Sequence, residues 1–361
     1  MAVLSFVAGL AFLIIGAEAL VRGASRLAVV LGISPLIIGL TVVAFATSSP
    51  ELAVSIKAAL NSQANIALGN VVGSNIFNVL FILGLSALIA PLIISQQLLR
   101  FDIPLMIALS IGILILSLDE KLSSADGLLL VTGLVIYICF LIYQSLRGNL
   151  EVKKQPAKEV GIERSSKSIW MKNTGLVIGG LTLLVLGSRM LVNASVSFAY
   201  YLGVSELIVG LTIIAVGTSL PEVVTSLTAV YRGERDVAVG NVIGSNIFNI
   251  LGVLGLTSII APTGIEVSAA AIGFDLPVMI AVAMACLPIF FTGGVISRKE
   301  GALLLGYYIS YTLYLILAAS HHDALPKFNV IMLYFVIPLT VITLITVALR
   351  EMHSRRKRFS K

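Results

Sequence analysis

The chain has 361 residues, of which 58% are hydrophobic and only 12% are charged, and its formal net charge is +6. Its mean hydropathy of +1.05 excludes an ordinary soluble domain, because about a quarter of the residues in such domains are charged. Apolar stretches recur from end to end, and roughly 20 helical residues suffice to cross a hydrocarbon core of about 30 Å. The sequence therefore predicts an all-α polytopic membrane protein.

Eleven membrane-spanning helices are predicted along the chain. In chain order they cover residues 3–22, 33–60, 66–90, 101–118, 126–146, 170–192, 204–230, 237–261, 274–291, 300–318 and 329–350. The first helix carries Glu18 and lacks the basic start of a signal peptide, so we expect it to be retained. Cys139 and Cys286 fall inside predicted helices, where we expect apolar packing rather than a disulfide.

The segment 147–169 is rich in Lys, Glu and Ser, and it divides the chain into two halves. We therefore predict a first five-helix repeat in 1–146, a cytoplasmic linker in 147–169, a second five-helix repeat in 170–320, and an extra transmembrane helix with a basic cytoplasmic tail in 321–361. Because the basic tail follows a membrane helix, we expect it to meet anionic lipid headgroups and not nucleic acid. The lipid bilayer is the predicted partner, and the oligomeric state is left open.

Basic residues predict the orientation of the helices, because positively charged loops stay on the cytoplasmic side. If the N-terminus lies outside, only four of the 24 basic residues fall on the outer side, namely Lys57, Lys121, Arg189 and Lys327. This strong bias predicts an outer N-terminus and a cytoplasmic C-terminus.

Two long segments of the chain match each other at a constant offset of 171 residues. The segment that starts at Gly39 matches the one that starts at Gly210, and both contain a PE pair followed by GN-x-x-GSNIFN. Each repeat contains five predicted helices, and this odd number places the second copy in the opposite orientation. Inverted repeats are common in secondary transporters, which bind substrates near the membrane midplane where broken helices of the two halves meet.

The sequences TSSPE at 47–51 and TSLPE at 218–222 interrupt two of the predicted helices. Proline has no N–H and clashes with the carbonyl four residues before it, so the carbonyls of Ala46 and Gly217 are expected to be free. Irregular backbone at membrane depth is tolerated only where it lines a cavity or is buried in protein. The two breaks therefore predict carbonyl oxygens that face a bound species.

Glu51 and Glu222 follow the two prolines directly, in spans that contain no central cationic partner. An ionised side chain there costs at least about 2.5 to 3.5 kcal/mol, so it must be protonated or face a cation. Ca2+ takes about 6 to 8 oxygen ligands from carboxylates, carbonyls and water, and two carboxylates match its charge. We expect the two glutamates to hold Ca2+.

The helices that follow the two glutamates carry a polar stripe at i, i+4 and i+8. Its members are Asn70, Ser74 and Asn78 in the first half and Asn241, Ser245 and Asn249 in the second. Such residues can serve only as interhelical hydrogen-bonding groups, a proline only as a kink, and an intramembrane glutamate only as a protonated packing residue. Because the whole set occurs twice, the cation-site interpretation is favoured.

Other acidic residues are placed outside this site. Asp102 and Asp275 each precede a proline at a helix start and are expected to be N-caps. Glu18 and Glu206 have no counterpart carboxylate in the other repeat, where Arg189 and Pro35 stand at the equivalent positions.

The repeated PE motif and GN-x-x-GSN-I-x-N resemble the two signature repeats of the cation/Ca2+ exchanger superfamily, specifically its prokaryotic sodium/calcium antiporter branch, over residues 1 to 320. The resemblance implies ten helices in two inverted five-helix repeats in the inner membrane of a prokaryote. It implies that Ca2+ is held by the carboxylates of Glu51 and Glu222 and the carbonyls of Thr47 and Thr218. It implies further Na+ ligands in Ser48, Ser74, Asn78, Ser219, Ser245 and Asn249, with the carbonyls of Ala44 and Ala215.

The sequence departs from the family pattern in two places. The first motif has Ala46 and Ser49 where the second has Gly217 and Leu220. Some relatives, including potassium-dependent exchangers, carry Asp at the position of Asn249, so Asn at this position argues against a potassium requirement.

The leading hypothesis is exchange of Ca2+ for Na+ by alternating access, with both ions as substrates and no cofactor. A proton/Ca2+ antiporter, or one for another divalent cation, is the alternative within the same fold. An ion channel could use the same oxygens. An intramembrane hydrolase is disfavoured because His321, His322 and His353 all lie in a loop or tail, away from any serine of the motif.

Overall fold

A computed structural model describes residues 2–61, 63–152, 167–201, 215–291, 294–320 and 324–336, with Pro338 and Val341. The first half contains α1 (Ala2–Leu31), α2 (Pro35–Ile38), η1 (Gly39–Val43), α3 (Ala44–Thr47), α4 (Ser49–Leu60), α5 (Ala64–Phe77), η2 (Asn78–Leu83), α6 (Gly84–Ile89), β1 (Leu92–Ile93), η3 (Leu98–Asp102), α7 (Ile103–Leu116), β2 (Lys121–Leu122) and α8 (Ser124–Val152), where η denotes a π-helical segment. The second half contains α9 (Lys167–Tyr201), α11 (Ala215–Gly217), α12 (Leu220–Tyr231), α13 (Arg235–Phe248), η5 (Asn249–Leu254), α14 (Gly255–Ile260), β3 (Ile265–Glu266), η6 (Ala271–Asp275), α15 (Leu276–Phe291), β4 (Val295–Ile296), α16 (Arg298–Ala319), α17 (Leu325–Ile331) and η7 (Met332–Val336). The predicted all-α fold is confirmed.

Seven helices of the described chain are long and apolar enough to cross a membrane, and all seven fall on predicted spans. The helix pair Pro35–Thr47 and Ser49–Leu60, bent by 41° at its break, is an eighth. The shorter apolar helix Ala271–Leu287 falls on a ninth predicted span. The two remaining predicted spans, 204–230 and 329–350, lie partly outside the described residues.

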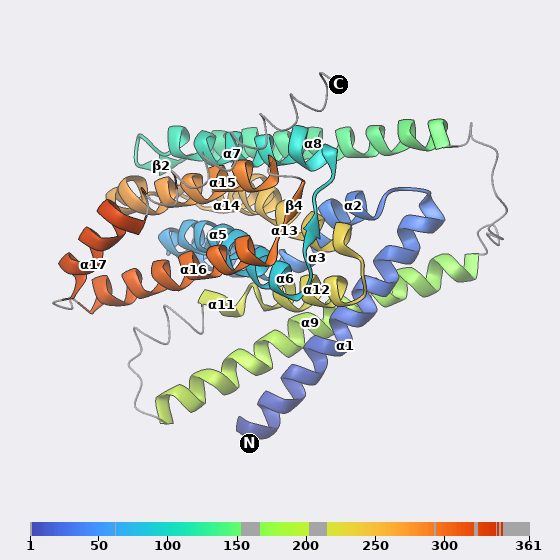
Figure 1. Ribbon diagram of the computed structural model, residues 1–361, viewed down its shortest axis with the longest axis horizontal. Helices are drawn as coiled ribbons and strands as arrows, with labels where there is room; N and C mark the ends of the chain where they lie inside the picture. The colour runs from blue at the N-terminus through green and yellow to red at the C-terminus, as the bar shows by residue number, and fades with distance from the viewer. Residues whose placement is uncertain are drawn as a thin grey trace, which may run out of the picture.

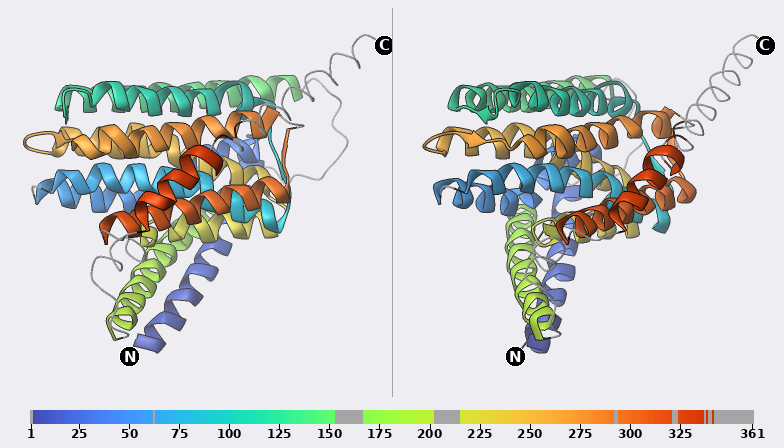
Figure 2. Two further views of the ribbon diagram at one scale, coloured as in Figure 1. Left: turned by 60° about the vertical axis from the view of Figure 1, so that its left-hand side comes forward. Right: turned by 90° about the vertical axis from the view of Figure 1, so that its left-hand side faces the viewer.

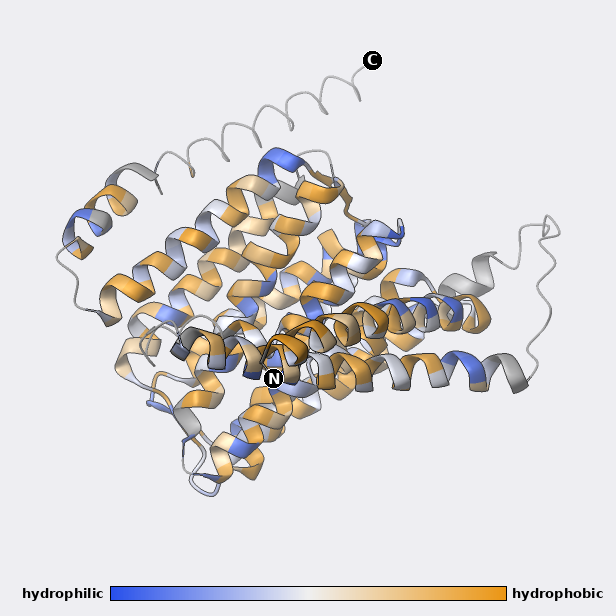
Figure 3. Cartoon of the chain, turned by 90° about the horizontal axis from the view of Figure 1, so that it is seen from below, coloured by the Kyte–Doolittle hydropathy of each residue, from blue (hydrophilic) through white to orange (hydrophobic). Residues whose placement is uncertain are grey.

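Large apolar side chains face outward along the helices. Leu4 is 72% exposed and Ile309 is 66% exposed, and hydrophobic residues follow most of the length of each helix (Figure 3). Exposing so much apolar surface to water is unfavourable, whereas contact with the hydrocarbon of a bilayer is not. The chain is therefore a multi-pass membrane protein.

The centre of the molecule is formed by the helices that carry the GN-x-x-GSN motifs. In the apolar 18-residue stretch of the span Arg235–Ile260, 83% of the residues are buried inside the protein. The corresponding share is 72% for Ile66–Ile89 and 22% for Ser124–Ser145. Most helices lie in stacked layers, with α8 in an outermost one (Figure 2). A Cβ at Gly244 of α13 would lie 2.7 Å from the backbone of Leu40, so a glycine is required for this close helix packing.

Helices α1 and α9 lie side by side at an angle to the others (Figure 1) and approach at glycines. They contain 30 and 35 residues, so the predicted ends at 22 and 192 are wrong. Those ends mark where the apolar run stops, whereas helical hydrogen bonds continue through polar residues such as Arg22 and Arg26. Both ends of the predicted linker 147–169 are helical for the same reason, since α8 ends at Val152 and α9 begins at Lys167.

Two short strand pairs join the halves of the chain. Strand β1 pairs antiparallel with β4, and β2 pairs antiparallel with β3. Strands β1 and β3 follow equivalent helices of the sequence repeat, as do β2 and β4, and the π-helical segments η2 and η5 are also equivalent. The sequence repeat is thus repeated in the secondary structure.

The prediction that Asp102 is an N-cap is wrong. Its backbone is helical, with φ −70° and ψ −39°, and its side chain makes no capping hydrogen bond. The π-helical segment η3 leads directly into α7, so there is no free helix end at this point. The hydroxyl of Tyr137 instead donates to Asp102 Oδ1 at 3.0 Å. Asp275 likewise ends η6 directly before α15.

Candidate cation-binding site

Both PE motifs lie where a helix breaks and a new one begins. Ser48 separates α3 from α4, and Ser219 precedes α12, each with ψ close to zero. The prolines occupy the first turns of the new helices, followed at once by Glu51 and Glu222. Because the amino end of a helix carries partial positive charge, each break places a carboxylate where negative charge is stabilised.

The two motifs are joined by hydrogen bonds from serine to glutamate. The hydroxyl of Ser219 donates to Glu51 Oε1 at 2.9 Å, and that of Ser48 donates to Glu222 Oε1 at 3.4 Å. Glu51 is 0% exposed and Glu222 is 1% exposed. The sequence repeat therefore brings both glutamates into one buried region, where each is held by the serine of the other motif.

Among the residues predicted as cation ligands, four buried oxygens have no hydrogen-bond partner in the described structure. They are Glu51 Oε2, Glu222 Oε2, Asn78 Oδ1 and Asn249 Oδ1. All four are acceptors, and a buried acceptor without a partner is unfavourable by about 1–3 kcal/mol, more when it is charged. No Lys or Arg is buried anywhere in the described chain, so no protein cation satisfies them.

The orientation of both amides is fixed by their nitrogen atoms. Asn78 Nδ2 donates to Asn246 Oδ1 at 3.0 Å, and Asn249 Nδ2 donates to Asn75 Oδ1 at 3.1 Å. Asn75 and Asn246 in turn donate to each other's backbone carbonyls at 3.3 and 3.4 Å. Since the amide nitrogens are used in this way, the Oδ1 atoms of Asn78 and Asn249 are the free ends.

Hydroxyl groups complete the wall between the halves. Ser74 Oγ lies 3.1 Å from Ser219 Oγ, and Ser245 Oγ lies 3.4 Å from Thr47 Oγ1. Their positions follow the sequence repeat, in which Ser74 and Ser245 are equivalent. These predicted residues are therefore adjacent to the two PE motifs.

Asn70 and Asn241, the first members of the polar stripe, have a structural role. The hydroxyl of Thr218 donates to Asn70 Oδ1 at 3.3 Å, and that of Thr47 donates to Asn241 Oδ1 at 3.1 Å. Their amide nitrogens donate to serine hydroxyls of the glutamate-bearing helices at 3.1 and 3.0 Å. Both ends of each amide are thus used within the protein.

The carbonyls at the breaks are used differently from the prediction. Ser188 of α9 donates its hydroxyl to the Gly217 carbonyl at 2.6 Å, so this oxygen has a partner within the protein. At the first break the Ser48 N–H donates to the carbonyls of Ala44 and Ala46, so the Ala46 carbonyl is not free as predicted, and the Leu52 N–H donates to the Ser48 carbonyl. The backbone bonds across the second break run to the carbonyls of Val216 and Ser219. The carbonyls of Thr47 and Thr218 are not used by these bonds, and Ala215 begins α11.

Comparison with known proteins identifies the family. The model of the sodium/calcium exchanger protein family matches residues 1–145 and 172–317. The chain belongs to this family. Sodium/calcium exchanger proteins are transporters, so the expectations of a transporter, and of ions that are substrates and not cofactors, are confirmed.

The matches to individual relatives cover most of this chain and nearly the whole of each relative. The chain is 41% identical over 307 residues to the putative antiporter CaxA of Alkalimonas amylolytica, which covers 84% of this chain and 95% of that protein. It is 33% identical over 334 residues to the sodium/calcium exchanger MaX1 of Methanosarcina acetivorans, again with 84% and 95% coverage. A solved structure of the sodium-calcium exchanger NCX_Mj is similar, with a TM-score of 0.73, 29% identity and coverage of 88% and 98%.

Several residues of this candidate site were not predicted from the sequence. Asn75 and Asn246, which orient the two free amides, could have been found because they recur in the repeated GSN motif. Ser55 and Ser226, which accept from the stripe asparagines, also lie at the repeat offset. Ser188 has no such signal, because the first repeat has Ala17 at its position.

Proposed function

We propose that the chain exchanges Ca2+ for Na+ across a membrane by alternating access at the site between Glu51 and Glu222. The observation that carries this proposal is the group of four unpartnered oxygens, two from carboxylates and two from amides. Hard cations such as Ca2+ prefer carboxylate and amide oxygens, and two carboxylates neutralise one Ca2+.

The full ligand set is proposed from position in the two motifs. Ca2+ takes the carboxylates of Glu51 and Glu222 and the carbonyls of Thr47 and Thr218. Na+ takes oxygens of Ser48, Ser74, Asn78, Ser219, Ser245 and Asn249 and the carbonyls of Ala44 and Ala215. Ca2+ and Na+ then compete for one set of acidic oxygens, and this competition couples their movements in opposite directions.

The membrane and orientation of the chain are part of the proposal. The chain is 37% identical over 287 residues to the inner membrane protein YrbG of Escherichia coli, which supports an inner membrane location. The distribution of basic residues supports an outer N-terminus and a cytoplasmic C-terminus.

The first prediction is that Glu51→Gln and Glu222→Gln each abolish Ca2+ uptake driven by a Na+ gradient. Glutamine keeps the shape of the side chain but removes the charge that offsets dehydration of Ca2+. The measurement is 45Ca uptake into proteoliposomes with imposed Na+ gradients. Glu266→Gln, at an exposed carboxylate of β3, is the matched control and should transport normally.

Uptake that persists in either site variant would remove that glutamate from the ligand set. The same assay separates the alternatives. Uptake that needs a pH gradient but no Na+ would establish proton/Ca2+ exchange, and Ca2+ flux without any counter-ion would establish a channel.

A further inference from the structure

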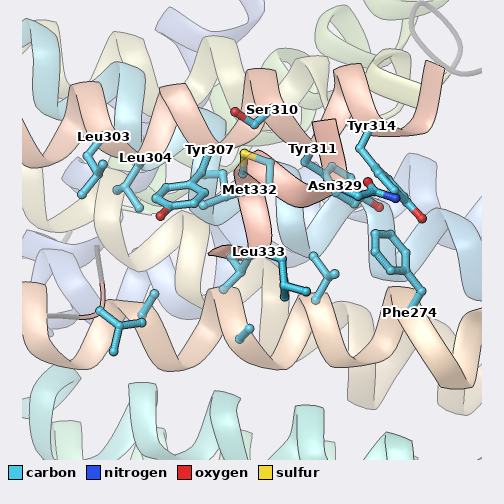
Figure 4. Close-up of a pocket in the computed structure, with 16 residues that line it drawn as sticks. Phe274, Leu303, Leu304, Tyr307, Ser310, Tyr311, Tyr314, Asn329, Met332 and Leu333 are labelled. Carbon is cyan, nitrogen blue, oxygen red and sulfur yellow. The ribbon is translucent and has the colours of Figure 1, made fainter. Parts of the chain in front are cut away.

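A cavity of about 520 Å3 lies between α15, α16 and the segment formed by α17 and η7 (Figure 4). None of its lining residues is charged, and most are aliphatic or aromatic. The family match ends at residue 317. The wall of the cavity formed by α17 and η7 therefore lies outside the part of the chain that matches the family. We call this cavity the C-terminal groove.

The groove lies among helices that face hydrocarbon. Helix α16 is a candidate membrane span, and only 6% of its apolar 18-residue stretch is buried inside the protein. Ile309 and Leu313 on the same helix are 66% and 42% exposed. An ionic ligand is therefore disfavoured, because no charged side chain lines the groove.

The polarity of the groove changes along its length. Figure 4 shows Leu303 and Leu304 at one end and Tyr314, Asn329 and Phe274 at the other. From Leu303 to Tyr314 the lining follows α16 for about 16 Å, at about 1.5 Å per residue. Tyr311, Tyr314 and Asn329 make their end of the groove the more polar one. Tyr side chains are enriched where hydrocarbon meets the headgroup region, so this end suits a lipid headgroup better than the leucine end does.

We propose that the C-terminal groove binds one acyl chain of a membrane phospholipid. The chain runs from the Tyr314 end, nearest its headgroup, to the Leu303 end. Water is a poor occupant, because it needs two to four polar partners that the apolar end lacks. An empty groove would leave its lining atoms without dispersion contacts, and the surrounding bilayer supplies hydrocarbon chains that restore them. This proposal does not depend on which ions the protein exchanges.

A photoreactive lipid tests the proposal. The full chain is reconstituted with a phosphatidylethanolamine that carries a diazirine near the end of one acyl chain, irradiated, and digested for mass spectrometry. Label should concentrate on the peptide that contains Leu303 and Leu304. Ala281→Trp, which fills the groove from α15, should remove most of this label. Met284→Trp is the matched control, because Met284 is on the same helix, 50% exposed and outside the lining.

The wild-type result is decisive even where a variant does not fold. Labelling at Leu303 and Leu304 that is no stronger than at Leu128 and Leu129, which are 63% and 62% exposed on α8, would overturn the proposal. So would disulfide cross-linking of an Ala281→Cys variant to a second copy of the chain, because the groove would then be a protein interface.

Discussion

Ser219 and Ser48 make equivalent contacts with unequal geometry. The Ser219 hydroxyl lies 2.9 Å from Glu51 Oε1, whereas the Ser48 hydroxyl lies 3.4 Å from Glu222 Oε1. Hydrogen bonds weaken with distance, and those to a charged group are the stronger class. Glu51 is therefore held more firmly than Glu222 by its serine.

We expect Ser219→Ala to weaken Ca2+ binding more than Ser48→Ala does. A hydrogen bond to a charged group contributes about 1.5–3 kcal/mol, and about 1.4 kcal/mol corresponds to a tenfold change in affinity. The half-saturating Ca2+ concentration for uptake should therefore rise about tenfold or more in Ser219→Ala. Ser197→Ala, which removes an exposed hydroxyl bonded within its own helix, should leave it unchanged. An equal or larger effect of Ser48→Ala would contradict the distance argument.

At this scale the sequence predicts candidate residues of the site but not their hydrogen bonds. The glutamates can be found because an intramembrane carboxylate is costly and because it occurs twice. The free ends of Asn78 and Asn249 cannot be found, because they depend on amides 168 and 174 positions away in the chain. The role of Asp102 was missed for the same reason, since its partner Tyr137 is on another helix.

Among the elements, α1 and α9 approach each other closely at glycines. A Cβ at Gly180 of α9 would lie 2.6 Å from the backbone nitrogen of Leu20 and 2.7 Å from the carbonyl oxygen of Gly16. These are backbone atoms, which cannot rotate away as a side chain can. The two helices can pack at this distance only while glycine occupies the crossing.

Gly180→Leu should therefore lower the thermal stability of the purified protein. Overpacking at a tight contact costs typically about 1–3 kcal/mol, and here the neighbouring atoms are backbone. Gly179→Leu is the matched control, because a Cβ at Gly179 meets nothing within 4 Å in the described structure, while its effect on helix propensity is the same. Equal shifts in melting temperature for the two variants would show that the crossing tolerates a side chain.

Element type was predictable where hydropathy and proline act locally, and element ends were not. The break in the predicted span 33–60 is present as a 41° bend, because Pro50 removes a backbone donor within the helix. The strand pairs had no such signal, because each strand contains two residues and shows no period. The ends of α1 and α9 were not predicted because hydropathy indicates which residues lie in the bilayer, whereas a helix can continue beyond it.

For the whole molecule, the two halves form one interdigitated body and not two separate domains. Both strand pairs connect the halves, and Asn75 and Asn246 donate to each other's backbone across them. The sequence repeat predicts which segments are equivalent, but equivalence does not reveal contact. The site needs both halves, because each carboxylate is bonded by a serine of the other half.

We expect the part of the chain that matches the exchanger family, which ends at residue 317, to function without the residues after 320. Every proposed ion ligand precedes residue 250, the family match ends at 317, and the likeness to NCX_Mj covers 98% of that chain but 88% of this one. A chain that ends at Ser320, after α16, should insert into membranes and show Ca2+ uptake driven by a Na+ gradient at a rate comparable with that of the full chain. The same truncated chain should lose acyl-chain labelling at Leu303 and Leu304, because one wall of the C-terminal groove is gone. Retained labelling with normal uptake would assign the lipid to α15 and α16 alone, whereas loss of uptake in a correctly inserted chain would show that the segment after 320 takes part in exchange.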